Sequence, residues 1–353
     1  MFNILDLYIA RTLLTTIAST LSVLVGLSAL IKFVEQLRRV GQGDYDMTVA
    51  GLYVILSLPR DIEQFLPMAT LLGALIGMGI LAQSSELIVM QAAGMSRKQI
   101  IISASKSIIF IIIAMMAVGE FVTPRSESKA KEIRTQALSG GSLLASDSII
   151  WAKDGNNFVS ISEVVNQNSL RNIDVFIFDA DLQLQQILNA QTADFKTEYW
   201  QLGNVTQTSL FENQIESQYM GQLQWESSLT PDKLGIVAVK PEALSIQGLY
   251  DYVQYLKNNG QDAARYELAF WRKIIQPASV VVMLLLALSF IFGPLRSVST
   301  GARIIMGVIA GFGFFITNEV FGQVSLVFQI SPIIGACLPS ILFTGIAGVL
   351  LNR

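Results

Sequence analysis

The residues of this sequence that could do chemistry are its charged side chains, because it contains no histidine and one cysteine. The lack of histidine removes Ser-His-Asp triads and most zinc sites, and Cys337 alone cannot form a disulfide within the chain. There is no G-x-x-x-x-G-K-[ST] run, so any ATP-driven work requires a separate ATPase. The charged side chains could hold an anionic ligand or form an ion pair with a partner, and carboxylates could also act as acids or proton relays.

One group of cations lies at the ends of apolar segments and could hold phosphate or carboxylate groups. Charge-assisted hydrogen bonds to such anions contribute about 1.5–3 kcal/mol each. Local ion pairing is the alternative, because Glu35, Glu63 and Glu127 lie at helical spacing from several of these cations. Both interpretations are open from the pattern alone. The candidate ligand-binding cations are Lys32, Arg38, Arg39, Arg60, Lys131 and Arg134, with Lys129 beside them.

A second candidate is the short stretch SSELIVMQAAG at 84–94. Ser85 is a possible N-cap, Glu86 lies where the helix dipole favours an anion, and Gly94 suits the position after the last turn. A helix of about eight residues is only about 12 Å long and cannot cross a bilayer. It either lies on the membrane surface or docks into a partner, and both remain open. The residues assigned to a docking contact are Glu86, Leu87 and Met90.

Apolar segments long enough to cross a membrane position these residues. Only 14% of the 353 residues are charged and 52% are hydrophobic, whereas soluble domains are about 25% charged. A bilayer core needs about 20 apolar residues in a helix. The first segment is too long for a signal peptide and lacks a small-residue cleavage site, so we interpret it as a retained span. The predicted spans are 12–31, 65–82 with an upstream extension at 52–58, 99–119, 274–292, 304–322 and 330–351.

Between the third and fourth spans the sequence becomes polar and alternates as strands do. The Asp154-Gly155-Asn156 turn between two alternating runs predicts a hairpin, and further strand–turn–strand patterns follow. We therefore expect an antiparallel β sandwich or open barrel. A connecting helix is predicted from Ser245, a possible cap, to Asn259-Gly260.

Two matching G-x-x-x-G-x-G motifs, at 73–79 and 307–313, predict close helix packing. We expect at least one to pack within the chain and leave open a seam with a partner subunit for the other. The positive-inside rule places both termini in the cytoplasm and the β domain outside. The cations that argue for this orientation are Arg11, Arg97, Lys98, Arg296, Arg303 and Arg353 on the side of the termini, against Arg38 and Arg39 on the other.

Taken together, these stretches resemble the LptF/LptG family of lipopolysaccharide export permeases, and more closely its LptG branch. The resemblance covers essentially the whole chain. It implies transmembrane helices 1–3 with a cytoplasmic coupling helix over 1–122, a periplasmic antiparallel β-jellyroll with a connecting helix over 123–262, and transmembrane helices 4–6 over 263–353. The stretches that carry it are ALIKFVEQLRRVGQGDY, LAQSSELIVMQAAG, GGSLL, WAKDGNNFV, LTPDKLG, LKNNGQDAARYEL and LSFIFGPLRSV.

The resemblance also implies partners and roles. The chain would form an inner-membrane heterodimer with the permease LptF, driven by two copies of the ATPase LptB. Lipopolysaccharide would then pass by way of the jellyrolls to LptC and LptA. This chain would be non-catalytic and bind no cofactor, with ATP and Mg²⁺ held by the ATPase. Glu86 falls on the acidic position of the coupling helix, and the six candidate cations fall on positions that face the phosphates and core sugars of the lipid.

Three other functions remain open. A membrane enzyme acting on lipid would use Asp61, Glu63 or Glu319. A proton-driven transporter would use Glu319 as a relay, since an ionisable side chain within a span is costly and is usually functional. A structural anchor for the β domain would need none of these residues.

Overall fold

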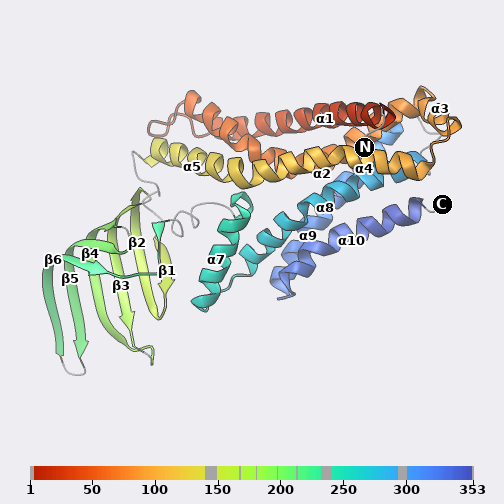
Figure 1. Cartoon of the computed structure of the whole chain (residues 1–353). Coiled ribbons are helices and arrows are strands. Elements are labelled where there is room, and N and C mark those ends of the chain that lie inside the picture. The colour runs from red at the N-terminus through yellow and green to blue at the C-terminus, as the bar shows by residue number, and fades with distance from the viewer. Residues whose placement is uncertain are drawn as a thin grey trace.

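A computed structural model describes residues 4–139, 149–166, 168–179, 181–196, 198–211, 214–231, 241–292 and 300–351. Its helices form an elongated bundle, and its strands form a sheet at one end of that bundle (Figure 1). The GGSLL stretch, Arg296 and Arg353, which entered the sequence argument, lie outside the described residues, as do parts of LTPDKLG and LSFIFGPLRSV.

The described part of the chain contains six helices long and apolar enough to cross a membrane, which confirms the predicted spans. The third span differs at its outer end, because a π-helical turn, η1 (Val118–Val122), continues directly into another helix. Residue 123, at which the β domain was expected to begin, lies inside this continuous helix. The helices are α1 (Ile4–Leu37), α2 (Met47–Gln83), α3 (Glu86–Ala92), α4 (Arg97–Ala117), α5 (Thr123–Ser139), α8 (Ala264–Phe292), α9 (Thr300–Val327) and α10 (Pro332–Leu351).

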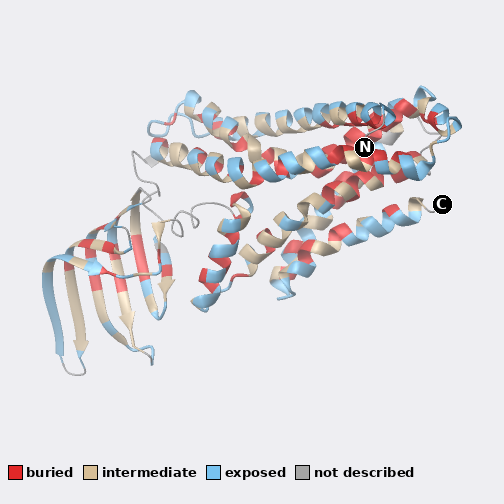
Figure 2. Cartoon of the chain, viewed as in Figure 1, coloured by how far each residue is buried: buried red, intermediate tan, exposed pale blue. Residues whose placement is uncertain are grey.

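The core of the bundle lies along α2 and α8, which carry most of the buried residues (Figure 2). In the most apolar 18-residue stretch of each helix, 72% of the residues of α2 and 61% of those of α8 are buried. In α1 only 11% of these residues are buried. Helices α1, α9 and α10 thus keep broad apolar faces outside the packed core. Such faces are stable only against lipid or against another protein.

Both glycine motifs pack within the chain. A Cβ atom at Gly73 would lie 2.5 Å from the Cα of Ile17, so α1 and α2 approach closely there. A Cβ atom at Gly311 of α9 would lie 3.2 Å from the Cγ of Met68 of α2, so this glycine faces side chains of α2. Each G-x-x-x-G pair is used for packing within the chain, whereas a Cβ atom at Gly313, the last glycine of the second motif, would meet nothing within 4 Å among the described residues.

The six described strands form one antiparallel sheet in the sequential order β1-β2-β3-β4-β5-β6. The predicted hairpin is confirmed, since Asp154 pairs with Asn157 across the turn. These strands make a meander, and the exchange of strands between two sheets that defines a jellyroll does not occur among them; residues 140–148 and 232–240 lie outside the described part. The strands are β1 (Ile150–Asp154), β2 (Asn157–Asn166), β3 (Ser169–Phe178), β4 (Leu184–Phe195), β5 (Trp200–Phe211) and β6 (Gln214–Trp225).

Helix α7 (Ile246–Asn258) joins the sheet to the bundle, after a short 3-10 turn, η2 (Pro241–Ala243). Its start and end are as predicted: the Ser245 hydroxyl accepts from the Gly248 N–H at 2.9 Å, and Gly260 follows with a positive φ of 61°. Tyr252 and Leu256 join the core of the sheet. Leu249 packs on the other side against Ala269 of α8. The helix therefore ties sheet and bundle together.

Candidate functional site

The turn between α1 and α2 brings the cations of α1 beside α5. The backbone N–H of Asp44 donates to the Ala137 carbonyl of α5 at 2.8 Å. Gly43 has a positive φ of 55°, and a Cβ there would lie 2.6 Å from the same oxygen, so glycine is required. Asp46 then caps α2 by accepting from the Val49 N–H at 2.8 Å. This turn fixes the end of α1 against the end of α5.

Lys32 pairs with an acid of another helix, although its helical spacing from Glu35 would allow a local ion pair. Its ammonium lies 2.6 Å from a carboxylate oxygen of Asp61 on α2, and Ser28 donates to the other oxygen at 3.0 Å. The Asp61 side chain is 3% exposed and that of Lys32 is 28% exposed. The pair therefore holds α1 to α2 while part of the lysine faces outward.

Arg60 also pairs across helices, and not with Glu63 of its own helix. One terminal guanidinium nitrogen lies 3.4 Å from Glu127 of α5, and the other terminal nitrogen lies 3.7 Å from Glu242 of η2. The second oxygen of Glu127 is buried and accepts no hydrogen bond from the described residues. Arg60 thus forms ion pairs with acids of two separate elements and mainly links α2 to both.

Arg134 lies further along α5 and is held by an aromatic ring. Its guanidinium carbon is 5.1 Å from the centre of the Tyr53 ring of α2, and it donates to the Tyr53 hydroxyl at 3.4 Å. No carboxylate pairs with it among the described residues, which leaves most of its donors available.

Tyr45 is a buried residue that is influenced by the charges of both Arg134 and Arg39. This residue is 1% exposed and donates to Gln36 at 3.1 Å. Burial raises the pKa of its hydroxyl, and the charges of Arg134 and Arg39 oppose that rise. One cation of α5 and one from the turn after α1 therefore act electrostatically on the same buried phenol.

The predicted cations fall into two groups. Lys32 and Arg60 are engaged in ion pairs between helices. Arg38 and Arg39 are exposed and form no ion pair among the described residues, and Arg134 presents its free donors beside them. Lys131 is half-buried between Glu127 and Arg134 along α5. Arg38, Arg39, Lys131 and Arg134 together form a cationic surface, the candidate anion-binding surface, and the two interhelical pairs lie on the neighbouring helices.

The acids that might have served a membrane enzyme are committed to ion pairs. Glu63 lies 3.7 Å from the ammonium of Lys273 on α8, and both side chains are 8% exposed. Lys273 also donates to the Gly119 carbonyl at 2.9 Å. This carbonyl belongs to η1, where the α-helical hydrogen-bond pattern changes to a π-helical one. Glu319 pairs with Arg272 at 3.3 Å. Sequence spacing gave no sign of these partners, which lie far away along the chain.

At the other end of the bundle, α3 ends as predicted but its faces differ from the expectation. Gly94 has a φ of 100°, and Met95 and Gly94 donate to the carbonyls of Met90 and Gln91, each at 3.0 Å. Ser85 occupies the N-cap position but makes no side-chain cap, because its own backbone is left-handed with a φ of 61°. The helix is thus closed mainly at its C-terminal end.

Leu87 and Met90, expected in the docking contact, face the bundle and are only 4% and 6% exposed. Residues three apart share a helical face, so both anchor α3 on the core of the spans. The outward apolar pair is Ile88 and Val89, which are 56% and 65% exposed. Glu86 is half-buried at the start of the helix and accepts from the Ser84 hydroxyl at 2.9 Å.

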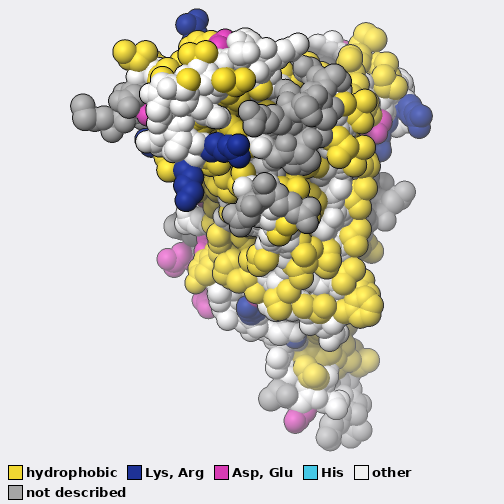
Figure 3. Space-filling view, turned by 90° about the vertical axis from the view of Figure 1, so that its right-hand side faces the viewer, with side chains coloured by type: hydrophobic (Ala, Val, Ile, Leu, Met, Phe, Trp, Pro, Cys, Tyr) yellow, Lys and Arg dark blue, Asp and Glu magenta, His cyan; other side chains and the backbone are white. Residues whose placement is uncertain are grey.

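Basic residues surround this end of the molecule. Arg11, Arg97 and Lys98 are exposed near the ends of α1 and α4. Figure 3, which views the end carrying α3 and the termini, shows groups of Lys and Arg bordering hydrophobic surface. An acidic helix start, an apolar pair and surrounding cations make this face suited to a protein partner.

Comparison with known proteins identifies relatives along the full length. Residues 7–353 match the family described as lipopolysaccharide export system permease LptF/LptG. The chain is 50% identical to the lipopolysaccharide export system permease protein LptG of Escherichia coli strain K12, over 100% of this chain and 99% of the relative. It is 47% identical, with the same coverage, to the protein of that name from Haemophilus influenzae.

Proposed function

Because the chain belongs to the LptF/LptG family of lipopolysaccharide export system permeases, we propose that it releases lipopolysaccharide from the inner membrane under the control of a separate ATPase. Family membership and six apolar helices identify a multi-pass inner-membrane protein. The observation that carries the proposal is the separation of two sites. The anion-binding surface lies at the end of the bundle next to the sheet, and α3 lies at the opposite end (Figure 1).

The anion-binding surface holds the phosphates of the lipid. Arg38, Arg39 and Arg134 offer planar guanidinium groups that bind phosphate through two parallel hydrogen bonds. Arg134 is oriented by the Tyr53 ring, so little side-chain entropy is lost when it binds. Lys32 and Arg60 act mainly by positioning, since Asp61 and Glu127 already neutralise them.

Helix α3 receives the movement of the ATPase. Ile88 and Val89 dock in an apolar groove of that partner, and Glu86 supplies an ion pair. Leu87 and Met90 transmit the displacement because they are packed in the core of the spans. The partner ATPase binds ATP and Mg²⁺, and this chain supplies no catalytic residue.

Movement of the spans then displaces the acyl chains. Their burial between two permease subunits contributes about 0.8 kcal/mol per CH₂, so narrowing the cavity weakens binding steeply. The cations keep the phosphates at the outer end during this step. In this account the termini and α3 are cytoplasmic and the sheet is periplasmic, as the exposed Arg11, Arg97 and Lys98 around α3 favour. The partners are the second permease, LptF, two copies of LptB, and the periplasmic acceptors LptC and LptA.

Photo-crosslinking tests the ligand site. A photoreactive amino acid replaces Arg39 in one form of the assembled complex and Ile109, on the exposed face of α4, in a control form. Both complexes are illuminated in proteoliposomes that contain lipopolysaccharide. Position 39 should capture lipopolysaccharide well above position 109. Equal capture at both positions would show that the cation surface does not hold the lipid.

A further inference from the structure

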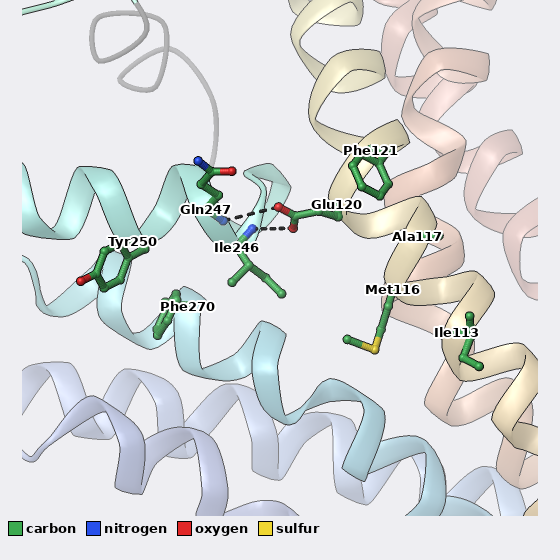
Figure 4. Close-up of a pocket in the computed structure, with 9 residues that line it drawn as sticks. All are labelled: Ile113, Met116, Ala117, Glu120, Phe121, Ile246, Gln247, Tyr250 and Phe270. Atoms are coloured by element: carbon green, nitrogen blue, oxygen red, sulfur yellow. Dashed lines mark hydrogen bonds between the residues drawn. The ribbon is translucent and has the colours of Figure 1, made fainter.

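A pocket with no role in the proposed export step lies between the third span and α7 (Figure 4). Its volume is about 780 Å³. Ile113 and Met116 of α4 and Phe121 of η1 form one wall, and Ile246, Tyr250 and Phe270 form the other. The lining is apolar except for Glu120 and Gln247. A cavity of this size and character suits a hydrocarbon chain.

The pocket faces away from the anion-binding surface. Thr123 and Glu127 point toward α2 and are 0% and 3% exposed. Phe121, which lines the pocket, is 61% exposed, and Arg125 one turn beyond it is also exposed. The two sites are therefore on different sides of the continuous α4–η1–α5 helix, and a ligand in one leaves the other free.

The depth of the pocket matches the outer boundary of a bilayer. At about 1.5 Å per residue, Ile113 and Phe121 lie roughly 24 and 36 Å along the helix from Arg97, and the hydrocarbon core is about 30 Å thick. Tyr250, Phe270 and Trp271 lie side by side here, with ring centres 6.2 and 5.4 Å apart in the two successive pairs. Aromatic side chains gather where hydrocarbon meets the headgroups.

The inner end of the pocket is continuous with lipid-facing surface. Ile109 and Ile113 of α4 are 50% and 60% exposed, and Phe110 beside them is 61% exposed. An acyl chain could therefore enter along α4 without leaving hydrocarbon. A water-soluble ligand would have to cross this apolar surface.

Opposite charges flank the outer end. The Glu120 carboxylate accepts from the backbone N–H groups of Ile246 at 2.8 Å and Gln247 at 3.5 Å (Figure 4). A carboxylate has about four acceptor positions, so Glu120 keeps room for an ammonium group. Arg125 forms no ion pair among the described residues and can take a phosphate.

We propose that this pocket binds one acyl chain of a bilayer phospholipid whose headgroup carries both a phosphate and a primary amine, as phosphatidylethanolamine does. The acyl chain fills the apolar cavity, Arg125 contacts the phosphate and Glu120 contacts the amine. The lipid then lies between the third span and α7, and it supports the helix that joins the sheet to the bundle.

Native mass spectrometry of the purified full-length chain tests the site with phosphatidylethanolamine, phosphatidylglycerol and lipid A as separate probes. The wild-type chain should bind one phosphatidylethanolamine more tightly than either other lipid. Ala117→Phe fills the cavity and should lower that affinity at least about tenfold, the scale of a lost acyl contact. Ile341→Phe adds the same side chain on the exposed face of α10, away from the pocket, and should bind as the wild type does. Arg125→Gln should weaken phosphatidylethanolamine binding.

Three results would overturn the assignment. Unchanged affinity in Ala117→Phe would show that the cavity is not the site. Equal binding of phosphatidylethanolamine and phosphatidylglycerol would remove the role of Glu120, and preferred binding of lipid A would make the pocket part of the export route. Thermal unfolding of each variant, expected to match the wild type, separates loss of binding from loss of fold.

Discussion

At the scale of single residues, the cations that look alike in sequence have different tasks. Lys32 and Arg60 are each held by a buried carboxylate, whereas Arg39 and Arg134 form no ion pair among the described residues. A charge that is already paired contributes little to a new anion, because binding must first compete with the existing partner. We therefore expect the unpaired arginines to dominate ligand binding.

Replacing the unpaired arginines should lower affinity for lipopolysaccharide. Arg39→Gln together with Arg134→Gln removes charge-assisted contacts of about 1.5–3 kcal/mol each, so the dissociation constant should rise at least about tenfold. This dissociation constant is measured by titrating the purified complex with labelled lipopolysaccharide. Arg171→Gln, an exposed position on β3, is the matched control and should have no effect. A double variant that binds as well as the wild type would contradict the assignment.

The buried pair of Glu63 and Lys273 should stabilise the chain. Lys273→Met leaves Glu63 as an unpaired buried charge, which costs about 3–5 kcal/mol. Thermal unfolding of the full-length chain in detergent should show this loss, and adding Glu63→Gln should restore most of it. If the double variant were no more stable than Lys273→Met, the two side chains would not act as a pair.

At the scale of elements, α3 and α7 each connect the bundle to something else. Helix α3 is anchored by Leu87 and Met90 and presents Ile88 and Val89. Helix α7 uses Tyr255 to hold the sheet, since its hydroxyl donates to the Lys153 carbonyl at 2.7 Å. Asn259 adds a second link by accepting from the Gly155 N–H at 2.8 Å. Each helix therefore packs against the spans with one face. The other face of α7 contacts the sheet, and the other face of α3 is exposed.

The two faces of α3 should respond differently to substitution. Ile88→Asp places a charge in the docking surface and should abolish co-purification of the ATPase without changing the thermal stability of the chain. Leu87→Ala removes a buried side chain and should lower that stability by about 2–5 kcal/mol. Loss of the ATPase in Leu87→Ala, with Ile88→Asp unaffected, would reverse the assignment of the faces.

Docking of the sheet on α7 should weaken at high pH. Burial raises the pKa of Tyr255 to about 12, above its ordinary value of 10.0. The folded chain favours the neutral phenol, so its stabilising effect is complete below pH 10 and is lost as pH rises through 12. Tyr255→Phe should cost about 1 kcal/mol at neutral pH and reduce this alkaline loss. Fluorescence of the sheet tryptophans during alkaline titration measures it, and an identical titration in the variant would exclude Tyr255.

At the scale of the whole molecule, the sequence predicted the elements better than their contacts. Spans, the hairpin at Gly155 and the caps of α7 follow from local patterns, and these were confirmed. The local ion pairs that helical spacing allowed for Lys32 and Arg60 do not form. Their observed partners, Asp61 for Lys32 and Glu242 for Arg60, come from other elements, and spacing indicates only pairs on one helix. The continuation of α4 into α5 was missed, since the polar sequence after Gly119 resembles the start of a separate domain.

The faces of α3 show the same limit. Four successive apolar residues do not reveal which side is buried, and only the packing against the spans assigns Leu87 and Met90 inward. Tyr53, which orients Arg134, was missed because a lone aromatic residue in an apolar helix carries no signal of a ligand site. The sequence therefore indicated which residue types are available at the two ends of the bundle. It did not indicate which side chains face outward or which partners they contact.

ATP-dependent release of lipopolysaccharide from proteoliposomes is the most direct test of the central claim that α3 drives a lipid held at the opposite end. The complete complex is compared with one that carries Glu86→Lys in this chain, with lipopolysaccharide binding measured in both. The account predicts that Glu86→Lys binds the lipid normally but loses release. Normal release by the variant would show that α3 is only a membrane-surface helix and would contradict the coupling proposed here.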